Sequence, residues 1–155
     1  MHKVVINDCY GGFGLSPLAR TELYRRKCGN PNAPVFYYKS EFGWSGTEYT
    51  KVPLNDDLDL VTLTEDLGDS FTIYHDDNDE ELTEKFDKAL FWFPPQCERH
   101  DKDLVAVVEE LGEKANSRYS KLKVVTIPGN KYQLNDYDGS EWIETPEQIN
   151  WTVIK

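Results

Sequence analysis

The sequence lacks an excess of basic residues and a long apolar run, and we expect no secretory leader. Its 17 lysines and arginines face 28 acidic residues, which gives a net charge of −11. A protein that neutralises phosphates needs lysine and arginine in excess, so we expect no direct nucleic acid partner. No apolar run approaches the ~20 residues that cross a bilayer, and we expect no membrane partner. The start Met1-His2-Lys3 leads straight into an expected strand, which favours a cytosolic protein.

The sequence is also poor in cysteine. Cys9, Cys28 and Cys97 are widely spaced and form no C-x-x-C pair, which is typical of reduced thiols and excludes a paired-cysteine zinc site. The acidic clusters at 65–69 and 75–81 lack the twelve-residue ligand spacing of a calcium loop. We therefore expect no metal and no cofactor.

The apolar pattern predicts more strands than helices. At 155 residues, with 39% hydrophobic residues, the chain is long enough for one domain with its own core. Helices are expected at 17–27 and 101–116, with a shorter helical or irregular piece at 80–88. Strands are expected at 4–6, 35–38, 58–64, 70–74, 89–93, 122–127, 131–137 and 140–144, with a short terminal strand within 149–154 and a loop at 40–53 that includes a short strand near Tyr49. The predicted fold class is α+β, a mostly antiparallel sheet packed with two main helices.

A glycine-rich turn near the start is the candidate site. Gly11, Gly12 and Gly14 follow a β-branched strand, and Ser16-Pro17 is typical of a helix start. Such a turn exposes backbone N–H groups at the positive end of a helix, where many proteins bind phosphate or carboxylate. However, the spacing matches neither G-x-G-x-x-G nor the P-loop. On the motif alone, a tight turn that serves only packing is the stronger interpretation.

The candidate ligand-binding set joins this turn to basic residues on the first helix and ahead of the second. Both helix starts offer free N–H groups. The first helix also ends in a run of cations, which either complements its dipole or forms a small basic patch. The predicted ligand-binding residues are Asn7, Asp8, Tyr10, Gly11, Gly12, Phe13, Gly14, Ser16, Arg20, Arg99 and His100.

Three blocks of sequence resemble a group of small proteins encoded by tailed bacteriophages and prophages. The blocks are residues 4–16, with the motif INDCYGGFGLS, residues 99–116, with RHD followed by LVAVVEELGEKAN, and residues 122–128 with 137–143. The middle of the chain departs from that pattern and is more acidic, so we expect a single domain, 1–155, with a variable insertion at about 31–90. The resemblance implies a phage origin, the host cytoplasm as location, and a role in host takeover or counter-defence. It implies no catalytic residue.

Several functions remain open from the sequence. The first is a non-catalytic protein that either sequesters a small anionic, nucleotide-like ligand or blocks a host protein. If the protein blocks a host protein, the acidic middle would mimic the charge of a nucleic acid and inhibit a host DNA-binding protein. The affinity of such binding would fall steeply as the salt concentration rises. A small enzyme would use Cys9 as nucleophile with His75 or His100 as base. A virion or scaffold component would instead form a homo-oligomer.

Overall fold

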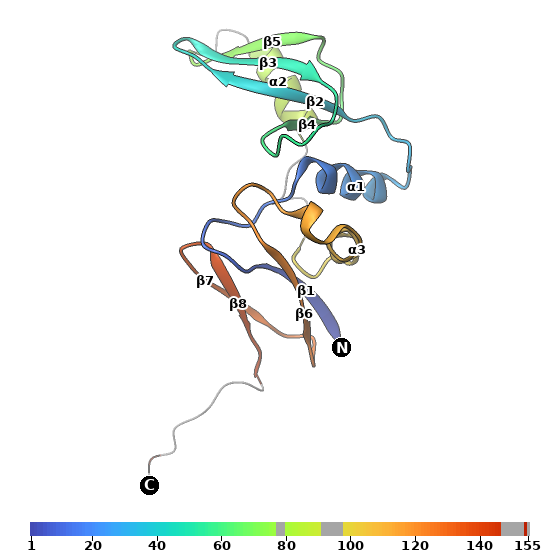
Figure 1. The fold of residues 1–155 in the computed structure, drawn as a ribbon, viewed down its shortest axis with the longest axis vertical. Helices are drawn as coiled ribbons and strands as arrows, with labels where there is room; N and C mark the ends of the chain where they lie inside the picture. The colour runs from blue at the N-terminus through green and yellow to red at the C-terminus, as the bar shows by residue number, and fades with distance from the viewer. Residues whose placement is uncertain (77–79, 91–97, 147–153, 155) are drawn as a thin grey trace.

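The computed structural model describes residues 1–76, 80–90, 98–146 and 154, and it shows an α+β fold with antiparallel sheets. Figure 1 shows two lobes, one above the other, with α1 between them. No helix among the described residues is both long and apolar enough to cross a bilayer. The element order already separates the lobes, because residues 36–90 form the upper one and the flanking segments form the lower one.

The lower lobe is built around the strand that opens the chain. Its elements are β1 (His2–Asn7), α1 (Pro17–Cys28), α3 (Lys102–Leu111), the 3-10 turn η1 (Gly112–Ala115), β6 (Leu122–Ile127), β7 (Gln133–Tyr137) and β8 (Ser140–Glu144). β1 pairs with β6, and its β-branched residues are buried on both faces. Val5 packs against the two helices, whereas Val4 and Ile6 pack toward the β7–β8 hairpin. The lobe therefore has three layers with the β1–β6 pair in the middle.

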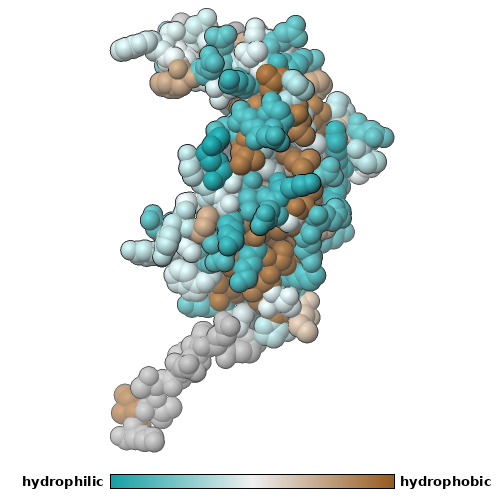
Figure 2. All heavy atoms as spheres, viewed as in Figure 1, coloured by the Kyte–Doolittle hydropathy of each residue, from teal (hydrophilic) through white to brown (hydrophobic). Residues whose placement is uncertain are grey.

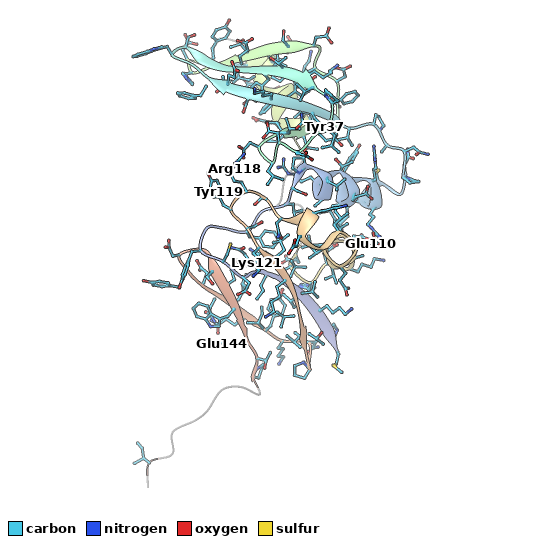
Figure 3. The ribbon with its side chains drawn as sticks, in the orientation of Figure 1. Tyr37, Glu110, Arg118, Tyr119, Lys121 and Glu144 are labelled. Atoms are coloured by element: carbon cyan, nitrogen blue, oxygen red, sulfur yellow. The ribbon has the colours of Figure 1, made fainter. Side chains whose placement is uncertain are left out.

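The upper lobe is a sheet covered by one helix. Its elements are β2 (Phe36–Phe42), β3 (Gly46–Val52), β4 (Val61–Leu63), β5 (Ser70–Tyr74) and α2 (Glu80–Ala89), and the strand order is β4-β2-β3-β5. Tyr38, Tyr49 and Phe71 lie on one face of the sheet, where Phe86 of α2 packs against them. On the opposite face, Tyr37 contacts α1 through its hydroxyl, which lies 2.6 Å from that of Thr21 (Figure 3). Each lobe thus has a core of its own.

The two lobes differ in charge. Residues 36–90 contain 15 acidic residues and 4 lysines, a net charge of −11, and the rest of the sequence contains 13 acidic and 13 basic residues. The whole net charge of the protein therefore belongs to the upper lobe. We refer to residues 36–90 as the acidic lobe and to the remaining described residues as the neutral lobe.

Local sequence signals place several element ends correctly. The hydroxyl of Ser16 accepts a hydrogen bond from the amide of Ala19 and caps α1, with Pro17 in the first turn. The turn of the β7–β8 hairpin has positive φ at both Asp138 (51°) and Gly139 (88°), as the type I′ turn requires. The strands expected at 131–137 and 140–144 and the helix start expected at Ser16-Pro17 are thus confirmed.

Other element predictions are wrong or fall outside the description. The stretch 40–53 is no loop, because it completes β2 and forms all of β3. The helix expected to reach 116 ends as an α-helix at Leu111, and Gly112 starts the 3-10 turn with φ of 57°. The helical piece expected at 80–88 is confirmed as α2 (Glu80–Ala89), which takes the first residue of the strand expected at 89–93. The rest of that strand, from 91, and nearly all of the terminal strand within 149–154 lie outside the described residues.

Candidate functional site

The glycine turn is held by hydrogen bonds within the chain. The amide of Gly11 donates to the carbonyl of Asp138 at 3.1 Å, and that of Gly12 donates to the carbonyl of Tyr119 at 3.1 Å. Tyr119 lies on the loop that precedes β6, as labelled in Figure 3. Three segments that are distant in sequence therefore meet through their backbones, and two of the amides expected to bind a ligand are already occupied.

Steric contact explains why glycine is needed at this junction. A Cβ added to Gly11 would lie 2.3 Å from the Tyr119 carbonyl oxygen, and one added to Gly139 would lie 2.1 Å from the Gly11 carbonyl oxygen. Gly14 is also confined, because its Cβ would lie 2.7 Å from the hydroxyl of Ser117. These glycines permit close backbone approach, and the interpretation as a packing turn is the one that fits the geometry.

The side chain of Asn7 connects the same three segments through hydrogen bonds. Its side chain is fully buried, and its amide nitrogen donates to the carbonyls of Cys9 and Gly139 at 3.0 and 2.7 Å. Its carbonyl oxygen accepts from the amide of Lys121 at 2.8 Å, and the amide of the exposed Asp8 donates to the Lys121 carbonyl. The polar groups of Asn7 are thus used in holding the junction together, and the prediction that this side chain faces a ligand is wrong.

The start of α1 is closed in the same way. The amide of Ser16 donates to the carbonyl of Ala115 at 2.9 Å, and its hydroxyl donates to the carbonyl of Lys114 while it caps the helix. A cleft of about 460 Å³ lies beside this helix start, and its lining includes Leu54 and Asp56 of the acidic lobe. The cleft is also lined by Lys114, so its charged residues, Asp56 and Lys114, are of opposite sign and give no preference for an anion. The expectation that the donors of Ser16 would be open to a ligand is therefore wrong.

The two arginines of the predicted set serve as internal partners. Arg99 makes a bidentate ion pair with Glu141, at 2.5 and 2.9 Å, and lies 3.6 Å above the ring of Phe13. Arg20 donates to the carbonyls of Leu15 and Leu60, at 3.1 and 3.2 Å. The two guanidinium groups thus contact different parts of the chain, and the expected anion pocket is not assembled.

Arg20 and His100, two further members of the predicted ligand-binding set, also have partners within the chain. Burial lowers the pKa of Arg20, and the carboxylate of Asp59 offsets part of the effect. His100 places its Nδ1 atom 2.8 Å from the hydroxyl of Tyr132, beside a cavity of about 220 Å³ that His2 also lines. Of the predicted set, Tyr10 is left as a large exposed side chain, with 73% of its surface accessible.

The basic end of α1 is also paired. Arg26 contacts Glu110, and Lys27 contacts Asp101 and Asp103 at the start of α3. The pKa of Lys27 is raised, since the hydrogen bonds and charges of the two aspartates outweigh its partial burial. This run of cations therefore ties α1 to α3.

The residues proposed for enzyme chemistry lie apart. The thiol of Cys9 lies 3.4 Å from Oδ1 of Asn7 and 3.5 Å from the carbonyl of Tyr119. His75 contacts the carbonyl of Gly43 in the acidic lobe, and His100 contacts Tyr132. The structure thus gives Cys9 a hydrogen-bonding role in the junction, and neither histidine is placed beside it.

The surface that sequence reasoning missed lies on the acidic lobe. Glu41 of β2 and Glu48 of β3 are direct cross-strand neighbours, and the turn between them carries the exposed rings of Phe42 and Trp44. A short connection that contains glycine, between two runs that carry aromatic and β-branched residues, is a hairpin signal. The interpretation of 40–53 as a loop hid this signal and the glutamate pair with it.

Comparison with protein-family models, with curated proteins and with solved structures finds no match. The candidate site therefore has to be judged on its geometry and charge.

Proposed function

We propose that this chain is a phage protein that acts by binding in the host cytoplasm, where its acidic lobe docks onto a basic surface of a host protein. The proposed phage origin rests on the resemblance of residues 4–16, 99–116, 122–128 and 137–143, and the proposed docking rests on the charge of the acidic lobe. This protein would block its target, a DNA-binding protein above all, by presenting negative charge where a nucleic acid would lie.

The segregation of charge carries this proposal. Twelve of the thirteen acidic residues that the structure describes in the acidic lobe are exposed, and the sequence of this lobe has only four lysines with which to pair them. In the neutral lobe, by contrast, basic and acidic residues are equal in number. A charge that served only solubility would have no reason to be confined to one lobe.

The closed glycine turn supports docking over ligand sequestration. The amides of Gly11, Gly12 and Ser16 are used within the chain, and Arg99 is paired with Glu141. A small anion would have to displace these bonds before it could bind. A basic protein surface needs no such rearrangement, because the carboxylates that it meets already face solvent.

A capture experiment tests the proposal. The tagged chain is incubated with a nuclease-treated bacterial lysate at low salt, and the retained proteins are identified by mass spectrometry. We expect basic, DNA-binding proteins that are released as the salt approaches about 0.3 M. The variant Glu65→Gln/Glu84→Gln/Asp87→Asn removes three exposed charges of the acidic lobe and should retain them about tenfold less well.

A matched variant controls for net charge. Asp8→Asn/Glu113→Gln/Asp136→Asn removes three exposed charges from the neutral lobe. If charge position decides binding, this variant retains the same proteins as the unchanged chain. Equal losses in both variants, or retention that salt does not alter, would contradict the proposal.

A further inference from the structure

The tip of the β2–β3 hairpin presents two aromatic rings to solvent. Trp44 is fully exposed and Phe42 is 83% exposed. We call residues 42–46 the aromatic tip. In Figure 1 the hairpin projects sideways from the acidic lobe, and in Figure 2 this end of the molecule overhangs a hollow. Exposed tryptophan contributes nothing to the core, and tryptophan is the residue most enriched among the energetic centres of protein interfaces.

The aromatic tip is held in one conformation. The amide of Gly43 donates to the carbonyl of Gly46 at 2.8 Å, and the amide of His75 donates to the carbonyl of Ser45 at 2.9 Å. The ring of His75 packs against that of Phe42, with centroids 4.9 Å apart. A Cβ on Gly46 would lie 2.3 Å from a backbone carbonyl of β5, so the turn lies directly on that strand. A fixed tip loses little conformational entropy when it binds.

Two glutamates next to the aromatic tip are arranged in a way that lowers the stability of the sheet. Glu41 and Glu48 are exposed and directly opposite each other across β2 and β3. Like charges at such positions destabilise a sheet. The placement of this glutamate pair beside an exposed tryptophan is explained if a partner with basic residues contacts the glutamates and the tryptophan together.

We infer that the aromatic tip is the anchor of the proposed docking: Trp44 enters an apolar pocket on a bacterial protein, and lysines or arginines around that pocket face Glu41 and Glu48. This inference rests on the proposed function and names the contact that gives it affinity. The same carboxylates repel a nucleic acid or an anionic membrane. They also disfavour a second copy, which carries the same net charge of −11.

Crosslinking from the tip identifies the partner and the contact together. The full chain carries the photoreactive residue p-benzoylphenylalanine in place of Trp44, is irradiated in the nuclease-treated lysate, and its adducts are sequenced. We expect adducts on one bacterial protein, at an apolar position bordered by lysine or arginine. The control carries the same group in place of Tyr137, which is 72% exposed on the neutral lobe, and should give no such adduct.

Three crosslinking results would overturn the inference. The first is an adduct formed only with a second copy of this chain, and the second is an adduct formed only with lipid. The third is an equal yield from positions 44 and 137. A parallel sedimentation assay with vesicles of phosphatidylethanolamine and phosphatidylglycerol tests the lipid outcome directly, and we expect no co-sedimentation.

Affinity measurements with the identified protein separate the anchor from the charge. Trp44→Ala should weaken binding about 30-fold, whereas Tyr137→Ala should leave it unchanged. Because Trp44 is fully exposed, Trp44→Ala should unfold at the same temperature as the unchanged chain. If Trp44→Ala binds normally while Glu65→Gln/Glu84→Gln/Asp87→Asn binds weakly, the proposed function stands and the anchor is wrong. If both variants bind normally, both proposals are wrong.

Discussion

The neutral and acidic lobes use charge in opposite ways. In the neutral lobe, ion pairs join elements that are distant in sequence, namely Lys3 with Glu109, Arg26 with Glu110, Lys27 with Asp101, and Arg99 with Glu141. In the acidic lobe, carboxylates far outnumber lysines, and one pair of glutamates is set side by side. The comparison teaches that charge joins distant elements of the neutral lobe, whereas the lysines of the acidic lobe, such as Lys51 beside Asp66, are too few to pair most of its carboxylates.

The largest expected effect comes from the partly buried ion pair of the neutral lobe. The side chains of Arg99 and Glu141 are 17% and 9% exposed, and Glu141 also accepts from the amide of Asn7. Glu141→Ala removes the carboxylate from a partly buried guanidinium and should lower the free energy of unfolding by about 2 kcal/mol. Urea denaturation measures this loss. Arg118→Ala, which removes the exposed pair with Asp59, should leave the midpoint unchanged, and equal losses would contradict the contrast.

The next effect tests the closed glycine turn. Gly11→Ala places a Cβ 2.3 Å from the carbonyl oxygen of Tyr119, at a φ of 152° that favours glycine. We expect a loss of about 2 kcal/mol in the free energy of unfolding. Gly12→Ala is the matched control, since its Cβ meets nothing within 4 Å. If both substitutions are tolerated, the turn is looser than the structure indicates and an open anion site regains support.

A smaller effect depends on pH. Burial raises the pKa of Asp101, but hydrogen bonds from Lys27 and from the amides of α3 have a larger effect in the opposite direction. The pKa of Asp101 therefore lies below its ordinary value of 3.8. The folded state therefore gains stability from this carboxylate above that pH and loses it as the pH falls through the folded pKa. Asp101→Asn should cost about 1 kcal/mol at pH 7 and progressively less below about pH 4.

The acidic lobe supplies the control for this pH effect. Asp87→Asn removes an exposed carboxylate from the last turn of α2, where a negative charge is unfavourable. We expect no loss of stability at pH 7. A loss of the same size from both substitutions would mean that the two lobes do not differ in their use of charge.

The smallest effect has the opposite sign. Glu48→Lys converts the repulsive pair with Glu41 into an attractive one and should raise the free energy of unfolding by about 0.5 kcal/mol. In the neutral lobe, Glu109→Lys removes the partner of Lys3 and should lower the same quantity. Thermal unfolding at low salt measures both shifts, and added salt should reduce them. A loss of stability in Glu48→Lys would contradict the proposed cost of the glutamate pair.

Local chemistry in the sequence was enough to predict the ends of elements and the fold class. Ser16-Pro17 and Asp138-Gly139 specify a cap and a turn with few alternatives, since each depends on neighbouring residues alone. The long β2–β3 hairpin was missed because its outer halves are polar and exposed, so the apolar alternation that signals a strand is weak there.

The sequence could not show whether the glycine turn is open to a ligand, because that depends on contacts between segments that are distant in the chain. The glycine turn alone offers unpaired amides, and only the fold brings the loops around Tyr119 and Asp138 into hydrogen-bonding distance. Arg99 likewise pairs with Glu141, which lies on a strand 42 positions later in the chain. The acidity of the middle was visible in the sequence, but its confinement to one lobe required the fold.

The two ends of the acidic lobe lie close together, which affects how the sequence of the protein can evolve. Phe36 pairs with Leu63, and Leu63 bridges to Leu90, so the lobe begins and ends on either side of one strand, about 10 Å apart. Such closely spaced ends let a whole unit be inserted, exchanged or excised without cutting through the remaining core. Selection could thus replace the module that meets a target as that target changes, while the rest of the molecule stays constant.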